Sequence, residues 1–161
     1  MNRRANSTED SRTAVRRVAL ELLARREHSV LELRQKLIWR AFPPADIDAV
    51  LERLVAEKLL NETRYAEIYA HSRADKGYGP LRIDRELRER GVPDEIIAPV
   101  LAGLAAHWRQ GLAGLHRKKF KGAPPGDVGD EMKQMRFLRR RGFTVEQITG
   151  MFRDLKERSS A

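Results

Sequence analysis

Apolar residues recur along this chain at the spacing of a helix rather than that of a strand. The first stripe contains Val15, Val18, Ala19, Leu22 and Leu23, which are three or four residues apart and therefore share one helical face. Similar stripes follow to the end of the sequence, separated by proline and glycine, and no segment alternates between apolar and polar residues. The pattern predicts an all-α fold with nine helices and no sheet.

One pattern of apolar and turn residues occurs three times, and residues 82–104 form its middle copy. A shift of 50 residues places Leu37 on Leu87, and a further shift of 51 residues places Leu138 on the same position. Neither alignment needs a gap, although each crosses two helices and their turn. The sequence therefore predicts tandem repeats, in which these three leucines occupy equivalent buried positions.

Each copy is expected to be a three-helix unit that resembles a helix-turn-helix. The expected boundaries are residues 12–60 for repeat 1, 61–104 for repeat 2 and 105–158 for repeat 3, with a GAPPG linker at 122–126. Residues 1–11 are polar and lack periodicity, so we expect a disordered tail there.

Polar residues with capping chemistry mark several helix ends. Ser29 with Glu32, and Thr144 with Gln147, have the spacing of a capping box, in which each side chain accepts a hydrogen bond from an unpaired amide. Gly91 is expected to end its helix in the left-handed conformation, which glycine adopts without steric cost.

The composition points to an anionic partner. The chain has 32 Lys and Arg against 23 Asp and Glu, a net charge of +9, and the excess is concentrated in the C-terminal third. Such a balance suits a polyanion or an acidic protein surface. There is no cysteine, which excludes disulfides and thiolate metal sites and fits a reducing compartment. No apolar run approaches membrane-spanning length and the N-terminus is polar, so we expect a soluble, cytoplasmic protein that does not bind membranes.

Candidate catalytic chemistry is sparse. The four histidines form no i, i+4 pair and have no adjacent carboxylate motif, so solvated or capping roles are the better interpretation. The sequence contains no phosphate-binding glycine loop, dinucleotide fingerprint or nucleophile elbow. We therefore expect no enzyme activity, no catalytic residue, no cofactor and no metal.

Basic residues supply the remaining candidate chemistry. They include two rows with a spacing of about three residues, which are Arg82, Arg85 and Arg88 in repeat 2 and Lys133, Arg136, Arg139 and Arg140 in repeat 3. The row in repeat 2 is accompanied by Glu86 and Glu89, so a solvated face explains it as well as a binding face does. Acids are sparser around the row in repeat 3, which favours binding. Guanidinium groups suit phosphate oxygens and carboxylates alike, so the sequence does not separate DNA from an acidic protein groove. The candidate contact residues are Arg25, Arg26, Arg82, Arg85, Arg88, Arg117, Lys118, Lys119, Lys133, Arg136, Arg139 and Arg140.

The residues at 19–37 (ALELLARREHSVLELRQKL) and 64–92 (RYAEIYAHSRADKGYGPLRIDRELRERGV) resemble the RecX family of bacterial recombination regulators. The resemblance covers roughly residues 13–155, although Ala41 stands where a glycine is expected and GAPPG looks like a local insertion. It implies three three-helix repeats in an elongated, curved monomer. It also implies a non-catalytic modulator that docks in the groove of RecA filaments on DNA and suppresses RecA ATPase, strand exchange and coprotease activities.

A second hypothesis comes from the charge alone. The repeats could act as free-standing helix-turn-helix modules that bind single-stranded or double-stranded DNA. Because no helix start carries a cluster of Asn, Gln and Arg suited to reading base edges, such binding would be independent of sequence. An enzyme with a site split between repeats is a third and weaker alternative.

Overall fold

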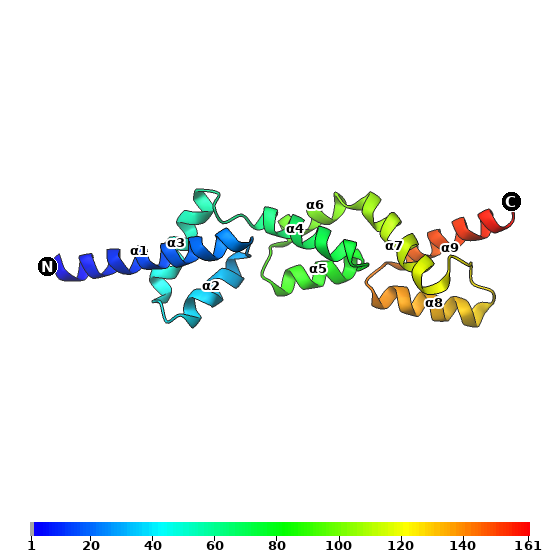
Figure 1. Ribbon diagram of the computed structural model, residues 1–161, viewed down its shortest axis with the longest axis horizontal. Helices are drawn as coiled ribbons and strands as arrows, with labels where there is room; N and C mark the ends of the chain where they lie inside the picture. Colours follow the sequence, from blue (N-terminus) through cyan, green and yellow to red (C-terminus); the bar gives the residue numbers. More distant parts are fainter. Residues whose placement is uncertain (1) are drawn as a thin grey trace. The chain divides into compact units, whose positions relative to one another are not determined.

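A computed structural model describes the backbone of residues 2–161 and the side chains of residues 7–161 (Figure 1). The described residues form nine α-helices and no strand, which confirms the all-α prediction. None of these helices is both long and apolar enough to cross a bilayer. The helices are α1 (Asn2–Arg25), α2 (Val30–Trp39), α3 (Pro44–Ala56), α4 (Glu62–Asp75), α5 (Pro80–Glu89), α6 (Asp94–Ala102), α7 (Ala105–Phe120), α8 (Val128–Arg140) and α9 (Val145–Ser159).

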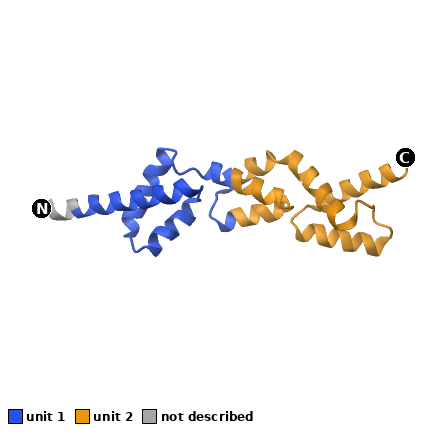
Figure 2. Ribbon diagram, viewed as in Figure 1, with its two compact units in different colours: residues 1–66, 88–96 blue, residues 67–87, 97–161 orange. Residues whose placement is uncertain are grey.

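The chain divides into two compact units (Figure 2). Unit 1 contains residues 1–66 and 88–96, and unit 2 contains residues 67–87 and 97–161. The division crosses α4, α5 and α6, so the helices of repeat 2 contribute residues to both units.

The core of unit 1 is the contact region of α1, α2 and α3. Val15 from α1, Leu33 and Leu37 from α2, and Ile47 and Leu54 from α3 are fully buried in one cluster. These are the inward positions of the stripes in the sequence, and their burial supplies most of the stability of such short helices.

Unit 2 has a core of the same kind, in which Leu112 of α7 packs with Leu138 of α8 and with Ile148 and Phe152 of α9. The three leucines that the repeat register made equivalent, Leu37, Leu87 and Leu138, all have an exposed fraction of 0%. The predicted burial of all three leucines is therefore confirmed.

Helix α1 begins at Asn2, so the expectation of a disordered tail was wrong for residues 2–11, and Met1 lies outside the described residues. Side chains near the tail tie α1 to α3: the Ser11 hydroxyl donates to Asp46 Oδ2 at 2.7 Å, and Arg12 Nε donates to Asp46 Oδ1 at 3.2 Å. Once a helix is nucleated, each further residue adds a hydrogen bond at little cost. The apolar stripe stops at Val15 because the preceding turns have no core to face.

The two predicted capping boxes formed to different degrees. At α9, the Thr144 hydroxyl accepts from the Gln147 amide at 3.1 Å and the Gln147 side chain accepts from the Thr144 amide at 2.9 Å, a complete box. At α2, the Ser29 hydroxyl accepts from the Glu32 amide at 3.1 Å. The Glu32 carboxylate pairs with Arg26 instead, because a cation competes well with a neutral amide for a carboxylate.

The turn after the second helix of every repeat is left-handed. Gly91 has a φ of 78° and Gly142 a φ of 99°, which confirms the expected glycine cap, and Ala41 has a φ of 62° in the equivalent turn. Alanine can adopt this conformation only at a cost of about 1–2 kcal/mol. The departure at Ala41 therefore leaves the geometry of the turn in place.

The same contact joins successive repeats within each unit. In unit 2, the Gly79 amide donates to the Arg141 carbonyl at 2.7 Å and the Leu81 amide donates to the Gly142 carbonyl at 2.9 Å. A Cβ on Gly142 would lie 2.5 Å from Cβ of Arg82, and in unit 1 a Cβ on Gly91 would lie 2.8 Å from Cβ of Leu31. In both junctions, the glycine turn of one repeat lies against the first turn of the second helix in the preceding repeat.

Candidate contact surface

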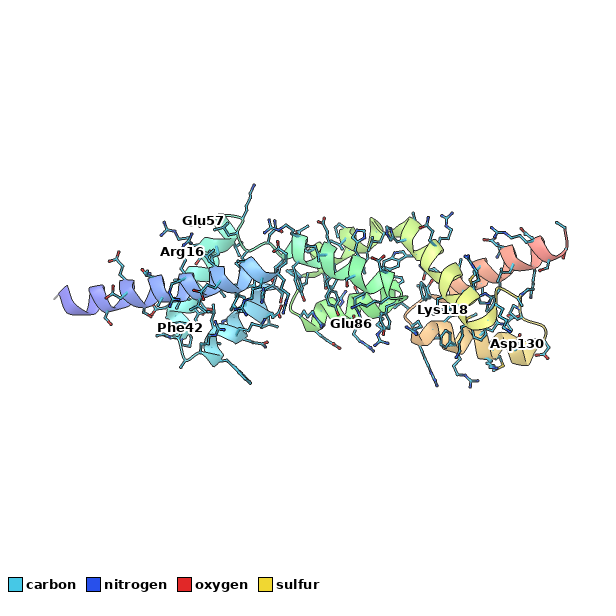
Figure 3. The ribbon with its side chains drawn as sticks, viewed as in Figure 1. Arg16, Phe42, Glu57, Glu86, Lys118 and Asp130 are labelled. Atoms are coloured by element: carbon cyan, nitrogen blue, oxygen red, sulfur yellow. The ribbon has the colours of Figure 1, made fainter. Side chains whose placement is uncertain are left out.

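Helix α8 is held in place by a hydrogen-bonded network at its first turns. The Asp127 side chain caps the helix by accepting from the Asp130 amide at 2.8 Å. Asp130, which is labelled in Figure 3, accepts through Oδ2 from the Gly126 amide at 3.1 Å and from the Gln134 side chain at 3.0 Å. Gln134 Oε1 accepts from buried His116 at 2.7 Å. This network fixes the rotation of α8 about its axis, with Gln134 and Leu138 facing inward.

The outer face of α8 carries the basic row of repeat 3. Its four members are exposed, and within the described part of the chain none of them has an ion-pair partner. The three arginines of the row, together with Met132 and Met135, line a hollow on this face. The surface therefore combines uncompensated positive charge with flexible apolar groups, which suits a protein partner better than a bare phosphate chain. The members of the row are Lys133, Arg136, Arg139 and Arg140.

Helix α5 carries the equivalent row, but its first arginine, Arg82, forms an ion pair with Glu86 of the same helix. Arg82 Nε donates to Glu86 Oε1 at 3.1 Å, Arg73 donates to both oxygens of Glu86 at 2.6 and 2.8 Å, and the Tyr69 hydroxyl donates at 2.8 Å. Burial would raise the pKa of Glu86, but the hydrogen bonds from Arg73, Tyr69 and Arg82 outweigh it and lower the pKa to about 2. Glu86 is thus an ionised carboxylate held between two guanidinium groups.

An aromatic ring completes this cluster. Guanidinium carbons of Arg73, Arg82 and Arg141 lie 3.9, 4.4 and 5.1 Å from the centre of the Tyr78 ring. The face of an aromatic ring attracts a cation, so Arg82 is held by the Tyr78 ring as well as by the Glu86 carboxylate. The row on α5 therefore begins with an arginine that serves the fold.

The remaining members of the α5 row are exposed, and they also interact within the chain. Arg88 Nη1 lies 2.6 Å from Asp94 Oδ1, and Arg85 takes part in further interactions of its own. The sequence left open that acidic residues balance the arginines of repeat 2, and this is the arrangement on α5. The basic row of α8 is the one without such acids.

The other candidate residues are distributed over both units. Arg26 Nη1 donates to Glu32 Oε2 at 3.0 Å in unit 1, beside exposed Arg25. At the end of α7 in unit 2, Arg117, Lys118 and Lys119 are exposed, and Lys119 Nζ lies 5.4 Å from the centre of the Phe137 ring.

Sequence reasoning missed Trp39, the last residue of α2. Its exposed fraction is 92%, and neighbouring Ile38 is 38% exposed. The signal was available, because Leu33 and Leu37 already complete the inward face of α2 and leave both residues off it. In the repeat register Trp39 occupies the position of Arg140, so the outer face of α2 is apolar where that of α8 is basic. Exposed apolar groups of this size commonly mark contact surfaces.

Like His116, the other three histidines, His28, His71 and His107, make hydrogen bonds or ring contacts within the chain. His28 is buried, its Nδ1 lies 2.9 Å from the Arg26 carbonyl, and its Nε2 lies 2.9 Å from Lys36 Nζ. Burial lowers the pKa of His28, so the ring is neutral and accepts from Lys36. His71 and His107 stack edge to face with ring centres 5.0 Å apart. Among the described residues no three His, Cys, Asp or Glu side chains are placed to hold a metal ion.

These features define a class: an all-α protein built from tandem helix-turn-helix-like repeats. Two family models match it, "RecX, first three-helix domain" over residues 16–54 and "RecX, second three-helix domain" over residues 61–101. The regulatory protein RecX of Pseudomonas savastanoi pv. phaseolicola is 46% identical over 139 residues, which are 86% of this chain and 90% of that protein. The regulatory protein RecX of Halorhodospira halophila is 44% identical over 135 residues, or 84% of each chain.

The fold agrees with this similarity in sequence. The crystal structure of RecX from Lactobacillus salivarius matches with a TM-score of 0.81 at 20% identity, covering 92% of this chain and 98% of that one. The chain belongs to the RecX family of regulatory proteins.

Proposed function

We propose that this protein binds in the helical groove of RecA filaments on DNA and lowers the ATPase, strand-exchange and coprotease activities of RecA. Membership of the RecX family supports the choice of partner. The observation that carries the proposal for this chain is the row on α8, whose cations have no carboxylate partner within the described residues. A protein groove rich in carboxylates would supply that partner.

Binding of this kind needs no catalytic residue. A repeat protein offers contacts distributed over its repeats, and a filament presents the same surface on every protomer. Exposed ion pairs contribute at most about 1 kcal/mol each, so several must act together. The protein then inhibits by occupying the groove and opposing the changes in filament structure that accompany ATP hydrolysis.

The primary test is a titration of the protein into RecA assembled on single-stranded DNA, with ATP hydrolysis and strand exchange as the measured quantities. We expect both rates to fall as the protein approaches the concentration of filament sites. The doubly substituted variant Arg139→Glu/Arg140→Glu should lose most of this inhibition. Unchanged rates at saturating wild-type protein would overturn the proposal.

A matched control separates the position of these charges from their number. Arg17→Glu/Lys76→Glu changes the net charge by the same amount at exposed sites outside the candidate residues. It should retain inhibition. Equal loss in both variants would show that total charge, and not the face of α8, determines binding.

The same α8 variant tests the alternative of direct DNA binding. Each lost phosphate contact lowers the slope of log affinity against log salt by about 0.9 for duplex and 0.7 for single strands, so two lost contacts lower it by about 1.4 to 1.8. We expect the slope for naked DNA to stay unchanged while RecA inhibition disappears. A fall in slope with a proportionate fall in inhibition would favour the DNA-binding function.

A further inference from the structure

A second candidate surface lies in unit 2, in a cleft between α7 and α9 on elements that the proposed function does not use. Trp108 and Leu112 from α7, and Met151 and Leu155 from α9, line it with apolar groups. Trp108 is fixed there, because its indole Nε1 donates to the Leu101 carbonyl at 3.1 Å. The floor of the cleft is therefore apolar and rigid.

The rim of the cleft is predominantly basic. Four arginines line it against two acids, Glu146 and Asp154. All four are exposed, and in the described part of the chain none of them forms an ion pair. The arginines are Arg109, Arg117, Arg153 and Arg158.

Repeat 1 contains a cleft of the same kind between α1 and α3, and there the chain supplies the carboxylates itself. Arg16 Nη2 lies 2.7 Å from Glu57 Oε2, and Arg53 Nε lies 3.2 Å from Glu57 Oε1. Arg16 and Glu57 are labelled in Figure 3. Asp46, which accepts from Arg12, provides a second carboxylate on α3. Arg12 and Arg16 of α1 are thus paired across the cleft, and Arg53 is paired within α3 and its C-cap.

The repeat register shows what replaces those carboxylates in unit 2. The position of Glu57 in α3 is occupied by Arg158 in α9, and the position of Asp46 is occupied by Gln147. Both Arg158 and Gln147 line the α7/α9 cleft. In the same register Arg53 is replaced by Asp154, so α9 has an acid where α3 has an arginine, and it has no acid at the positions of Glu57 and Asp46.

We propose that the α7/α9 cleft binds an acidic, amphipathic segment of another protein. Its carboxylates take the place that Glu57 and Asp46 have in repeat 1, and its apolar side chains cover Met151 and Leu155, the half-buried members of a floor in which Trp108 and Leu112 are already buried. A protein segment fits better than nucleic acid, because a phosphate backbone has nothing to cover the apolar floor and Glu146 and Asp154 repel it. The inference does not depend on RecA being the partner of α8.

The test uses a fluorescein-labelled peptide of about 15 residues, roughly 22 Å as a helix, with leucines on one face and glutamates on the other. Binding is measured by fluorescence anisotropy. A second peptide has serine in place of leucine, and a third has lysine in place of glutamate. The wild-type protein should bind the first peptide and show much weaker binding to the other two.

Substitutions in the protein locate the site. Arg153→Glu/Arg158→Glu should weaken binding of the first peptide by about tenfold or more, since two exposed ion pairs become repulsive. Arg153→Gln/Arg158→Gln should show a smaller loss in the same direction, while Arg139→Glu/Arg140→Glu on α8 should have no effect. Circular dichroism of each variant verifies that the helices are intact.

Trp108 provides a local readout. In a Trp39→Phe background it is the remaining tryptophan, so an unlabelled peptide without tryptophan should shift its emission on binding. Unchanged affinity in the cleft variants, or equal binding of the leucine and serine peptides, would overturn the proposal. So would displacement of the peptide by oligo(dT) at equal charge concentration, or self-association of the wild type that the cleft variants abolish.

Discussion

Helices α5 and α8 carry basic rows with the same spacing and have different surroundings. In α5, Glu86 lies between two guanidinium groups and is 9% exposed. In α8, the equivalent position is Phe137, and the position of Glu89 is Arg140. The partner of Arg88, Asp94, is likewise replaced by Val145. These three substitutions in the register remove acids that accompany the α5 row and leave the charge of the α8 row uncompensated. A row of arginines can be assigned to binding only after the carboxylates that could neutralise it within the same chain have been located.

The largest expected effect tests whether the two rows rest on equivalent helices. Leu87→Ala and Leu138→Ala each remove a fully buried side chain beneath a basic row. Each should lower the free energy of unfolding by about 2–5 kcal/mol through lost burial and a residual cavity. Urea denaturation followed by circular dichroism measures both, and a cost below about 1 kcal/mol at either position would contradict equivalence.

The second prediction concerns the carboxylate that distinguishes the rows. The pKa of Glu86 in the folded chain is about 2, below its unfolded value of 4.5, so the folded state binds fewer protons. The resulting stability is fully present above about pH 4.5 and is lost as the pH falls towards 2. The shift corresponds to roughly 3 kcal/mol at 1.36 kcal/mol per unit.

The variant Glu86→Gln supplies the control for this pH dependence. It should be less stable than the wild type at pH 7 by about 1.5–3 kcal/mol, because charge-assisted hydrogen bonds are lost. Its unfolding free energy should vary less between pH 4.5 and 2. Parallel pH profiles for the two proteins would show that another carboxylate controls acid unfolding.

A third prediction tests members of the two rows at one register position. Arg82 and Lys133 are equivalent, but only Arg82 contacts a buried carboxylate. Arg82→Gln should cost about 1 kcal/mol of stability, and Lys133→Gln less than about 0.5 kcal/mol. Thermal unfolding of both variants makes the comparison, and equal melting temperatures would remove the distinction between the rows.

The smallest effect extends the comparison to α2, the third helix in the register. Ala41 has a φ of 62° in the turn where α5 and α8 are followed by glycine. Ala41→Gly should therefore raise the unfolding free energy by about 0.5–1 kcal/mol, as the relief of left-handed strain exceeds the entropy gained by the unfolded chain. Denaturant unfolding at equal m-value is the measurement, and a loss of stability would contradict the argument.

Local and periodic signals predicted most of the fold. The stripe that contains Val15 and Leu22, the capping box at Thr144 and the left-handed Gly91 each depend on residues close in sequence. The helical start of α1 was not predictable in this way. The contact that ties this part of α1 to α3 joins Ser11 and Asp46, which are 35 residues apart in sequence and meet only after α1 and α3 have packed.

The candidate surface was harder to predict than the fold, for the same reason. Arg73 is 13 residues from Glu86 and lies on α4, and nothing in the local sequence pairs them. Charge spacing alone therefore did not separate α5 from α8, and only the sparser acids around the row in repeat 3 favoured α8. The exposure of Trp39 could have been predicted from the sequence, because the inward positions of α2 are Leu33 and Leu37. Trp39 lies outside that face, and its exposed fraction is 92%.

The glycine turns at the junctions also restrict the order in which repeats can be joined. Gly91 and Gly142 each face a neighbouring repeat so closely that a Cβ would lie within 2.8 Å of another atom. Ala41 has that Cβ, so repeat 1 cannot take an interior place in the series. An array lengthened by duplication would have to copy repeat 2 or repeat 3, because a second copy of repeat 1 would need glycine at Ala41 before it could follow another repeat.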